Sequence, residues 1–177
     1  MNDIVKEYGT GLFALASEEN IEKELLEQTR ALSKLFTPEY LHLLINPNLP
    51  KEKRISLAGE LLDGRVHLYI SNFVKLMIER SLAGEIVRCF EEFEALYYEK
   101  YGIIKMRAES AVELDDAQKE KLRQKLESHT GKMVEIEYVI DKTLIGGMRI
   151  VQSDRLIDDS IKQKLGEIGG LLASTVI

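Results

Sequence analysis

The hydrophobic period of the chain changes at Gly102, and this change limits the folds that the chain can adopt. Before Gly102, apolar residues recur at spacings of three and four, which is the period of an amphipathic helix. From Ile104 to Val112, apolar and small residues alternate with mostly charged ones, as they do in a half-buried strand. We therefore expect a helical N-terminal part and a change of architecture to a smaller part that contains strands.

Six helical segments are predicted before Gly102. They cover residues 3–17, 18–36, 37–46, 50–64, 66–82 and 85–101. In the third segment, Thr37 is placed to cap the helix and Pro38 to occupy its first position, while Asn46-Pro47 ends it. The fifth segment is the most apolar and carries apolar residues all round, which predicts a central helix that is buried on more than one side.

Two of these segments carry a clear apolar stripe on one helix face. In the second segment the stripe consists of Ile21, Leu25, Leu32 and Leu35. In the sixth it consists of Ile86, Phe90, Phe93, Tyr97 and Tyr101. Because each spacing keeps the residues on one face, we expect both stripes to pack against the rest of the helical part.

The C-terminal part is predicted to combine strands and helices. Asp115 and Gln118 have the spacing of a capping box, and Gly131 closes the helix that they begin. Alternating residues predict strands over 104–112, 134–140 and 148–151, and Asp158 to Ser160 supply N-cap candidates for a last helix. The expected fold is mainly α with a small α+β part. An N-terminal six-helix bundle (residues 1–102) would be followed by a C-terminal strand/helix module (residues 103–177).

The composition excludes several classes of function. The net charge of −6 opposes the phosphate neutralisation on which nucleic-acid binding depends, so no nucleic-acid partner is expected. A single cysteine, Cys89, fits a reducing compartment, and the N-terminus lacks the apolar core of a signal peptide. The longest uncharged stretch is 11 residues, too short to span a bilayer, so membrane association is expected only through partners.

The chain offers little catalytic or ligand-binding chemistry. It holds neither a Walker loop nor a dinucleotide fingerprint, and its three histidines lie on different segments without nearby ligands at metal-binding spacing. Asp154, Asp158 and Asp159 are better explained by a turn and an N-cap than by a bound cation, and Cys89 by packing than by catalysis. We expect no catalytic residue, no cofactor and no metal.

One apolar stripe contains a residue that a helix does not favour. Tyr8, Gly11, Leu12 and Leu15 share a face of the first helix, and glycine there costs about 1 kcal/mol relative to alanine. The stripe is either ordinary core, or the close approach of another helix explains the glycine.

Three segments resemble the delta subunit of bacterial F-type ATP synthases, the family of the mitochondrial oligomycin-sensitivity-conferring protein. The first is residues 7–16, similar to the family's opening helix except that Gly11 stands where alanine is usual. The second is Asn46-Pro47, followed by residues 51–54 and the apolar segment 73–80. The third and most specific is Gly146-Gly147 with a short strand, then Asp158, Ser160 and a leucine-bearing helix. Together they cover nearly the whole chain.

The resemblance implies a stator subunit that catalyses nothing and resists the torque of the rotor. The helical part would hold the N-terminal helix of an alpha subunit in a groove, and the C-terminal module would bind the C-terminus of the b subunit in the peripheral stalk. The residues implied to contact the alpha-subunit helix are Tyr8, Gly11, Leu12, Leu15, Val74 and Met77. The complex would place the chain at the cytoplasmic face of the cell membrane.

A different class of function remains open at this point. Gly146-Gly147 and the turn from Asp158 to Ser160 could instead form the site of a small α+β ligand-sensing or enzymatic domain. A third possibility is a generic helical scaffold with an unrelated partner.

Overall fold

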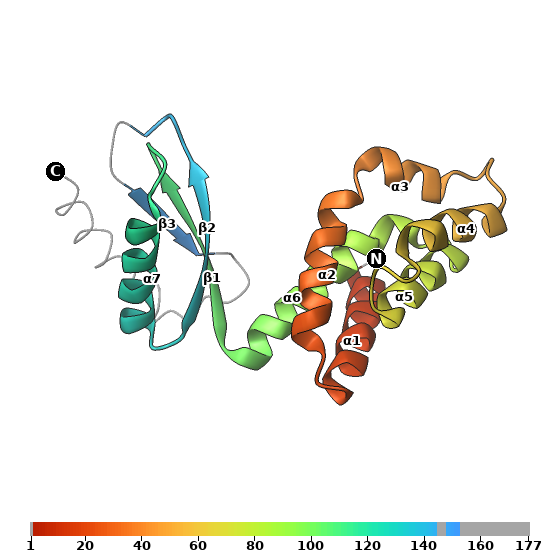
Figure 1. Ribbon diagram of the computed structural model, residues 1–177, viewed down its shortest axis with the longest axis horizontal. Coiled ribbons are helices and arrows are strands. Elements are labelled where there is room, and N and C mark those ends of the chain that lie inside the picture. Colours follow the sequence, from red (N-terminus) through yellow and green to blue (C-terminus); the bar gives the residue numbers. More distant parts are fainter. Residues whose placement is uncertain (1, 145–147, 153–177) are drawn as a thin grey trace. The chain divides into compact units, whose positions relative to one another are not determined.

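The computed structural model describes residues 2–144 and 148–152 (Figure 1). The described chain is mainly helical and has one small three-stranded mixed sheet, which confirms the predicted fold class at that level. It divides into two compact units, and the boundary lies between Tyr97 and Tyr98. Each unit has its own hydrophobic core.

The N-terminal unit is built from helices. These are α1 (Asn2–Glu18), α2 (Glu22–Leu35), α3 (Pro38–Ile45), α4 (Lys51–Leu62), α5 (Leu68–Glu79), the 3₁₀ turn η1 (Ala83–Glu85) and α6 (Ile86–Tyr101), whose last turn lies beyond the unit boundary. The signals around α3 act as predicted, because the Thr37 side chain accepts a hydrogen bond from the backbone N–H of Tyr40 and Pro38 is the first helical residue.

α5 is shorter than the segment predicted from its apolar residues. The Nδ1 atom of His67 accepts a hydrogen bond from the Tyr69 backbone N–H, which caps the N-terminus of the helix. After Glu79 the chain leaves the helix, and Ser81 has a φ of 61°. The prediction from apolar residues alone overestimated the length of α5, because it did not detect the cap at His67 or the end of the helix after Glu79.

The apolar stripe predicted for α2 was wrong at Leu35, which is 58% exposed. The buried stripe runs through Leu25, Thr29 and Leu32 to Phe36, which follows the helix and is 3% exposed. Phe36 rather than Leu35 continues the spacing of four and three, so the core takes Phe36 and leaves Leu35 in solvent.

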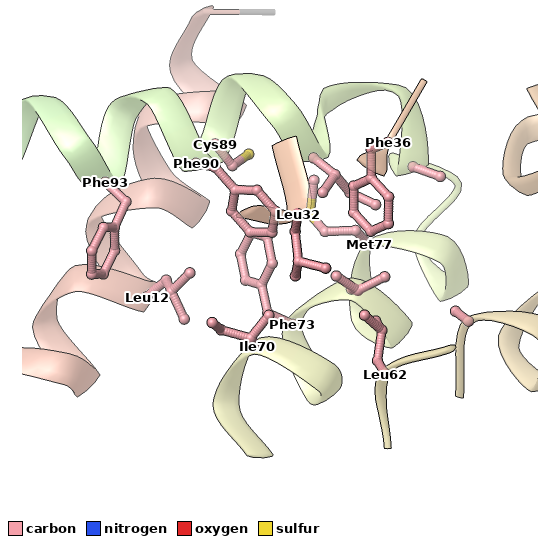
Figure 2. Packing of buried hydrophobic residues seen from close by; sticks show 14 of the residues in the cluster. Leu12, Leu32, Phe36, Leu62, Ile70, Phe73, Met77, Cys89, Phe90 and Phe93 are labelled. Carbon is pink, nitrogen blue, oxygen red and sulfur yellow. The ribbon is translucent and has the colours of Figure 1, made fainter. Parts of the chain in front are cut away.

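Aromatic residues from α6 fill the centre of the N-terminal core (Figure 2). Phe90 lies beside Phe73 of α5 with ring centroids 5.8 Å apart. Phe93 meets Phe13 of α1 edge to face at 5.4 Å. These contacts hold α1 and α5 against α6. Each buried aromatic pair stabilises the fold beyond the contribution of its buried area.

The C-terminal unit contains β1 (Ile103–Ser110), α7 (Asp116–Thr130), β2 (Met133–Ile140) and β3 (Met148–Gln152). The strand order is β2-β1-β3, with β1 parallel to β2 and antiparallel to β3. α7 connects the two parallel strands and lies along one face of the sheet (Figure 1). All three predicted strands are therefore confirmed.

Local sequence signals position α7 as predicted. Asp115 and Gln118 form a complete capping box, and Gly131 ends the helix with a φ of 66°, a conformation that glycine adopts without strain. Leu122 and Leu126 are buried in a core with the alternate residues of β1. The predicted last helix and its signature residues Gly146, Gly147, Asp158 and Ser160 lie outside the described residues.

Candidate binding groove

A groove of about 710 Å³ lies between α1 and α5 on the N-terminal unit. α1 contributes Glu7, Tyr8, Gly11, Leu12 and Leu15, and α5 contributes Tyr69, Asn72, Phe73 and Leu76. The groove is lined mainly by apolar and aromatic side chains, and Glu7 is the one charged residue among the described residues that line it. That composition is typical of a binding site for another apolar surface.

The floor of the groove is part of the protein core. Leu12 and Phe73 are 3% and 7% exposed, and Figure 2 shows both side chains among the packed core residues. The rings of Tyr8 and Phe73 meet edge to face with centroids 6.4 Å apart. The floor is thus held in place by contacts that the protein makes without any partner.

The walls of the groove expose large apolar side chains. Leu15 on α1 is 45% exposed and Leu76 on α5 is 37% exposed. Fully burying an exposed leucine side chain contributes about 1.5–3 kcal/mol, so a partner that covers both would gain part of that free energy from each. In the free protein both side chains remain partly exposed, so this free energy is not gained.

The polar groups of the groove lie toward its rim. Within the described part of the chain, neither Glu7 nor Asn72 has a hydrogen-bond or ion-pair partner, and both side chains are exposed. The Tyr69 hydroxyl donates a short hydrogen bond to Glu19, and this bond raises the pKa of Tyr69. The carboxylate of Glu19 therefore lies at one end of the groove.

Two glycines of α1 lie in different surroundings. A Cβ atom added to Gly9 would come within 2.8 Å of the Glu92 Cβ and 3.1 Å of the Cys89 carbonyl oxygen, so Gly9 permits close approach of α6. A Cβ added to Gly11 would meet nothing within 4 Å. The packing of this unit explains Gly9, whereas nothing in it requires Gly11.

The predicted contact residues fall into two groups. Tyr8, Gly11, Leu12 and Leu15 all line the groove. Val74 and Met77 do not line it, because both are 0% exposed and point into the core. The α5 wall consists instead of Tyr69, Asn72, Phe73 and Leu76. The sequence analysis missed this wall because the apolar residues of α5 lie on several faces of the helix. The four wall residues nevertheless have the i, i+3, i+4 and i+7 spacing that places residues on one helix face.

The titratable residues elsewhere form no reactive centre in residues 2–144 and 148–152. These residues contain no group of three or more His, Cys, Asp and Glu side chains that could hold a metal ion. Burial raises the pKa of Cys89 to about 11, so the thiol stays protonated. His67 caps α5, and His42 and His129 are exposed.

Comparison with known proteins identifies the family. The family model described as ATP synthase delta (OSCP) subunit matches residues 4–172. The chain belongs to this family. Curated relatives named ATP synthase subunit delta include one from Chloroherpeton thalassium, 32% identical over 96% of this chain and 93% of its own. Another, from Caldanaerobacter subterraneus, is 33% identical over 92% of each.

A solved structure agrees with this assignment at the level of the fold. A chain in the cryo-EM structure of the Toxoplasma gondii mitochondrial ATP synthase hexamer matches 96% of this chain with a TM-score of 0.66 and 14% identity. As a member of the ATP synthase delta (OSCP) family, the chain is a non-catalytic stator subunit, which confirms the stator role predicted from the resemblance. Among the described residues, no helix is long and apolar enough to cross a bilayer.

Proposed function

We propose that the groove between α1 and α5 binds the N-terminal helix of the ATP synthase alpha subunit and so attaches the stator to the catalytic head. The observation that carries this proposal is the groove itself, in which exposed leucines on two helices flank a preformed apolar floor. An amphipathic helix laid into such a groove covers the apolar walls and keeps its own polar face in water. Rigid walls also reduce the entropy lost on binding.

The second half of the proposal concerns the other unit. An N-terminal six-helix bundle (residues 1–102) would bind the head, and the α+β module (residues 103–177) would bind the C-terminus of the b subunit in the peripheral stalk. The separate hydrophobic cores of the two units support this division, because each unit can present its own binding surface. Within the assembled complex, the chain would lie at the cytoplasmic face of the cell membrane.

The binding site on the head can be tested with matched leucine variants. Leu15→Glu places a charge on the exposed α1 wall of the groove, whereas Leu35→Glu makes the same change at an exposed position on α2 outside the groove. Calorimetric titration of the full chain into a catalytic head that lacks this subunit should give one-to-one binding. We expect Leu15→Glu to weaken it by at least about 30-fold, because the new carboxylate must be desolvated against apolar walls.

The control variant decides how the result is interpreted. Leu35→Glu should bind the head like the unmodified chain, and circular dichroism should show that both variants keep their helices. Equal weakening by both variants, or no effect of either, would show that the groove is not the binding site for the head.

A further inference from the structure

The groove residues have a spacing that specifies how a helix packs against them. On α1 they include Tyr8, Gly11, Leu12 and Leu15, which are positions i, i+3, i+4 and i+7. The α5 residues Tyr69, Asn72, Phe73 and Leu76 have the same spacing. Four residues at these positions form the hole that receives one side chain in coiled-coil packing. The groove thus presents two such holes, one on each wall.

Residues at the same position in the two holes have similar burial. The i+4 residues, Leu12 and Phe73, are buried in the floor. The i+3 residues, Gly11 and Asn72, are exposed, and the free fold gives no reason for either: Gly11 has open space around it, and Asn72 has no hydrogen-bond partner in the described chain. Both residues are poor helix formers relative to alanine. A partner bound in the groove would therefore account for these two residues better than the fold of the free protein does.

The charges around the groove limit the chemistry of that occupant. Glu7 is the charged residue of the lining, and Glu19 lies at the groove end through its hydrogen bond from Tyr69. Residues 1–97 hold 16 Asp and Glu and 11 Lys and Arg, so this part accounts for five of the six net negative charges of the chain. A helix with basic side chains at its apolar edge would complement this surface.

We propose that the occupant is a basic amphipathic helix that packs along α1 and α5 as the third helix of a coiled coil. It seats a large apolar side chain over Gly11 and a basic side chain beside Glu7. This inference rests on the proposed function, and it specifies the pattern of the alpha-subunit helix. The occupant carries apolar residues at heptad spacing, and these fill the two holes. A left-handed crossing angle of about 20° between the helices keeps this one line of side chains facing α1 and α5.

The Gly11 contact is tested by adding volume to the hole. In the free chain, a Cβ added at Gly11 would meet nothing within 4 Å and the position is exposed, so Gly11→Ala and Gly11→Leu should both raise the thermal midpoint or leave it unchanged. In titrations of a catalytic head lacking this subunit, Gly11→Ala should weaken binding several-fold and Gly11→Leu by about 10-fold to 100-fold, because overpacking an interface forces it apart. Thr10→Ala is the matched control, as Thr10 is exposed and outside the groove.

The charge contact is tested by neutralising one carboxylate. Glu7→Gln should weaken binding and make the affinity less dependent on salt concentration. Glu27→Gln removes the same charge from an exposed position on α2 and should change neither quantity beyond the small effect of net charge. A synthetic peptide of the alpha-subunit N-terminal helix should reproduce both results.

The outcomes separate this inference from the proposed function. If Leu15→Glu abolishes binding while Gly11→Leu and Glu7→Gln bind like the unmodified chain, the groove binds the head but the coiled-coil arrangement is overturned. If Leu15→Glu also binds normally, the proposed function itself fails. Weakening by Gly11→Leu and Glu7→Gln, with Thr10→Ala and Glu27→Gln unaffected, supports the arrangement.

Discussion

The two sides of α1 differ in what covers them. One side packs against α6, where Gly9 permits a close approach that an added Cβ would disrupt and the Phe13 ring meets the Phe93 ring. The other side faces the groove. A Cβ added at Gly11 would meet no neighbour there, and the Leu15 side chain is 45% exposed. The same helix thus has a closed side that folding explains and an open side that the proposed binding would explain. Substitutions on the two sides should have different consequences.

The largest difference is expected for truncation of large side chains. Phe93→Ala removes a 0% exposed ring that packs on α1 from the closed side and should lower the free energy of unfolding by about 3–5 kcal/mol. Leu76→Ala, on the groove wall, should cost less than about 1 kcal/mol in the free chain. Urea denaturation measures both. A similar cost for the two variants would show that the groove wall is part of the core.

Thiol reactivity probes the closed side without a stability measurement. Cys89 lies where α6 meets α1, and burial raises its pKa to about 11 against about 8.5 for a free thiol. At pH 8 its alkylation by iodoacetamide should therefore be at least about a hundredfold slower in the folded chain than in urea. Mass spectrometry follows the reaction. Rapid labelling of the folded chain would mean that the contact between α1 and α6 opens readily.

The two glycines give a smaller but more specific comparison. Gly9→Ala should destabilise the chain by about 1–3 kcal/mol, because the new methyl group meets Glu92 and the backbone of α6. Gly11→Ala should stabilise it by up to about 1 kcal/mol, because alanine favours the helix and meets no neighbour. Thermal unfolding of the two variants gives the signs. Equal signs would remove the distinction between the two sides.

A small pH effect tests whether α5 is held on the side away from the groove. Lys75 and Ser71 of α5 both donate hydrogen bonds to the Asp63 carboxylate, and these bonds, that of Lys75 above all, lower its pKa. A lowered pKa means that the ionised carboxylate stabilises the fold above about pH 4 and that this contribution is lost as the pH falls through the folded-state pKa. Asp63→Asn should therefore lower the thermal midpoint at pH 7 and have less effect at pH 2.5.

Much of the fold could be predicted because its signals are local. The N-cap at Thr37, the capping box at Asp115 and the end of α7 at Gly131 each depend on a few neighbouring residues, so the sequence contains the whole interaction. The error at Leu35 has the opposite cause, because which of two adjacent apolar residues is buried depends on where the chain turns after α2. Periodicity does not record that turn.

The candidate site was predicted on one wall and missed on the other for a similar reason. On α1 the apolar stripe and Gly11 distinguish one face, so four contact residues could be named. On α5, apolar residues cover several faces, and only tertiary packing determines that Val74 is buried while Leu76 borders the groove. Sequence periodicity finds a helix face when one face differs from the rest, and it fails when most faces are apolar.

Protection of a cysteine placed at Gly11 tests the central claim most directly. In the free chain, a maleimide should label Gly11→Cys quickly, since the position is exposed and Cys89 is buried. Addition of the catalytic head should slow that labelling strongly, while Leu35→Cys, exposed on α2, stays reactive. That result would show that the open side of α1 is covered by the head. Equal labelling of Gly11→Cys in the free and the bound chain would contradict the account.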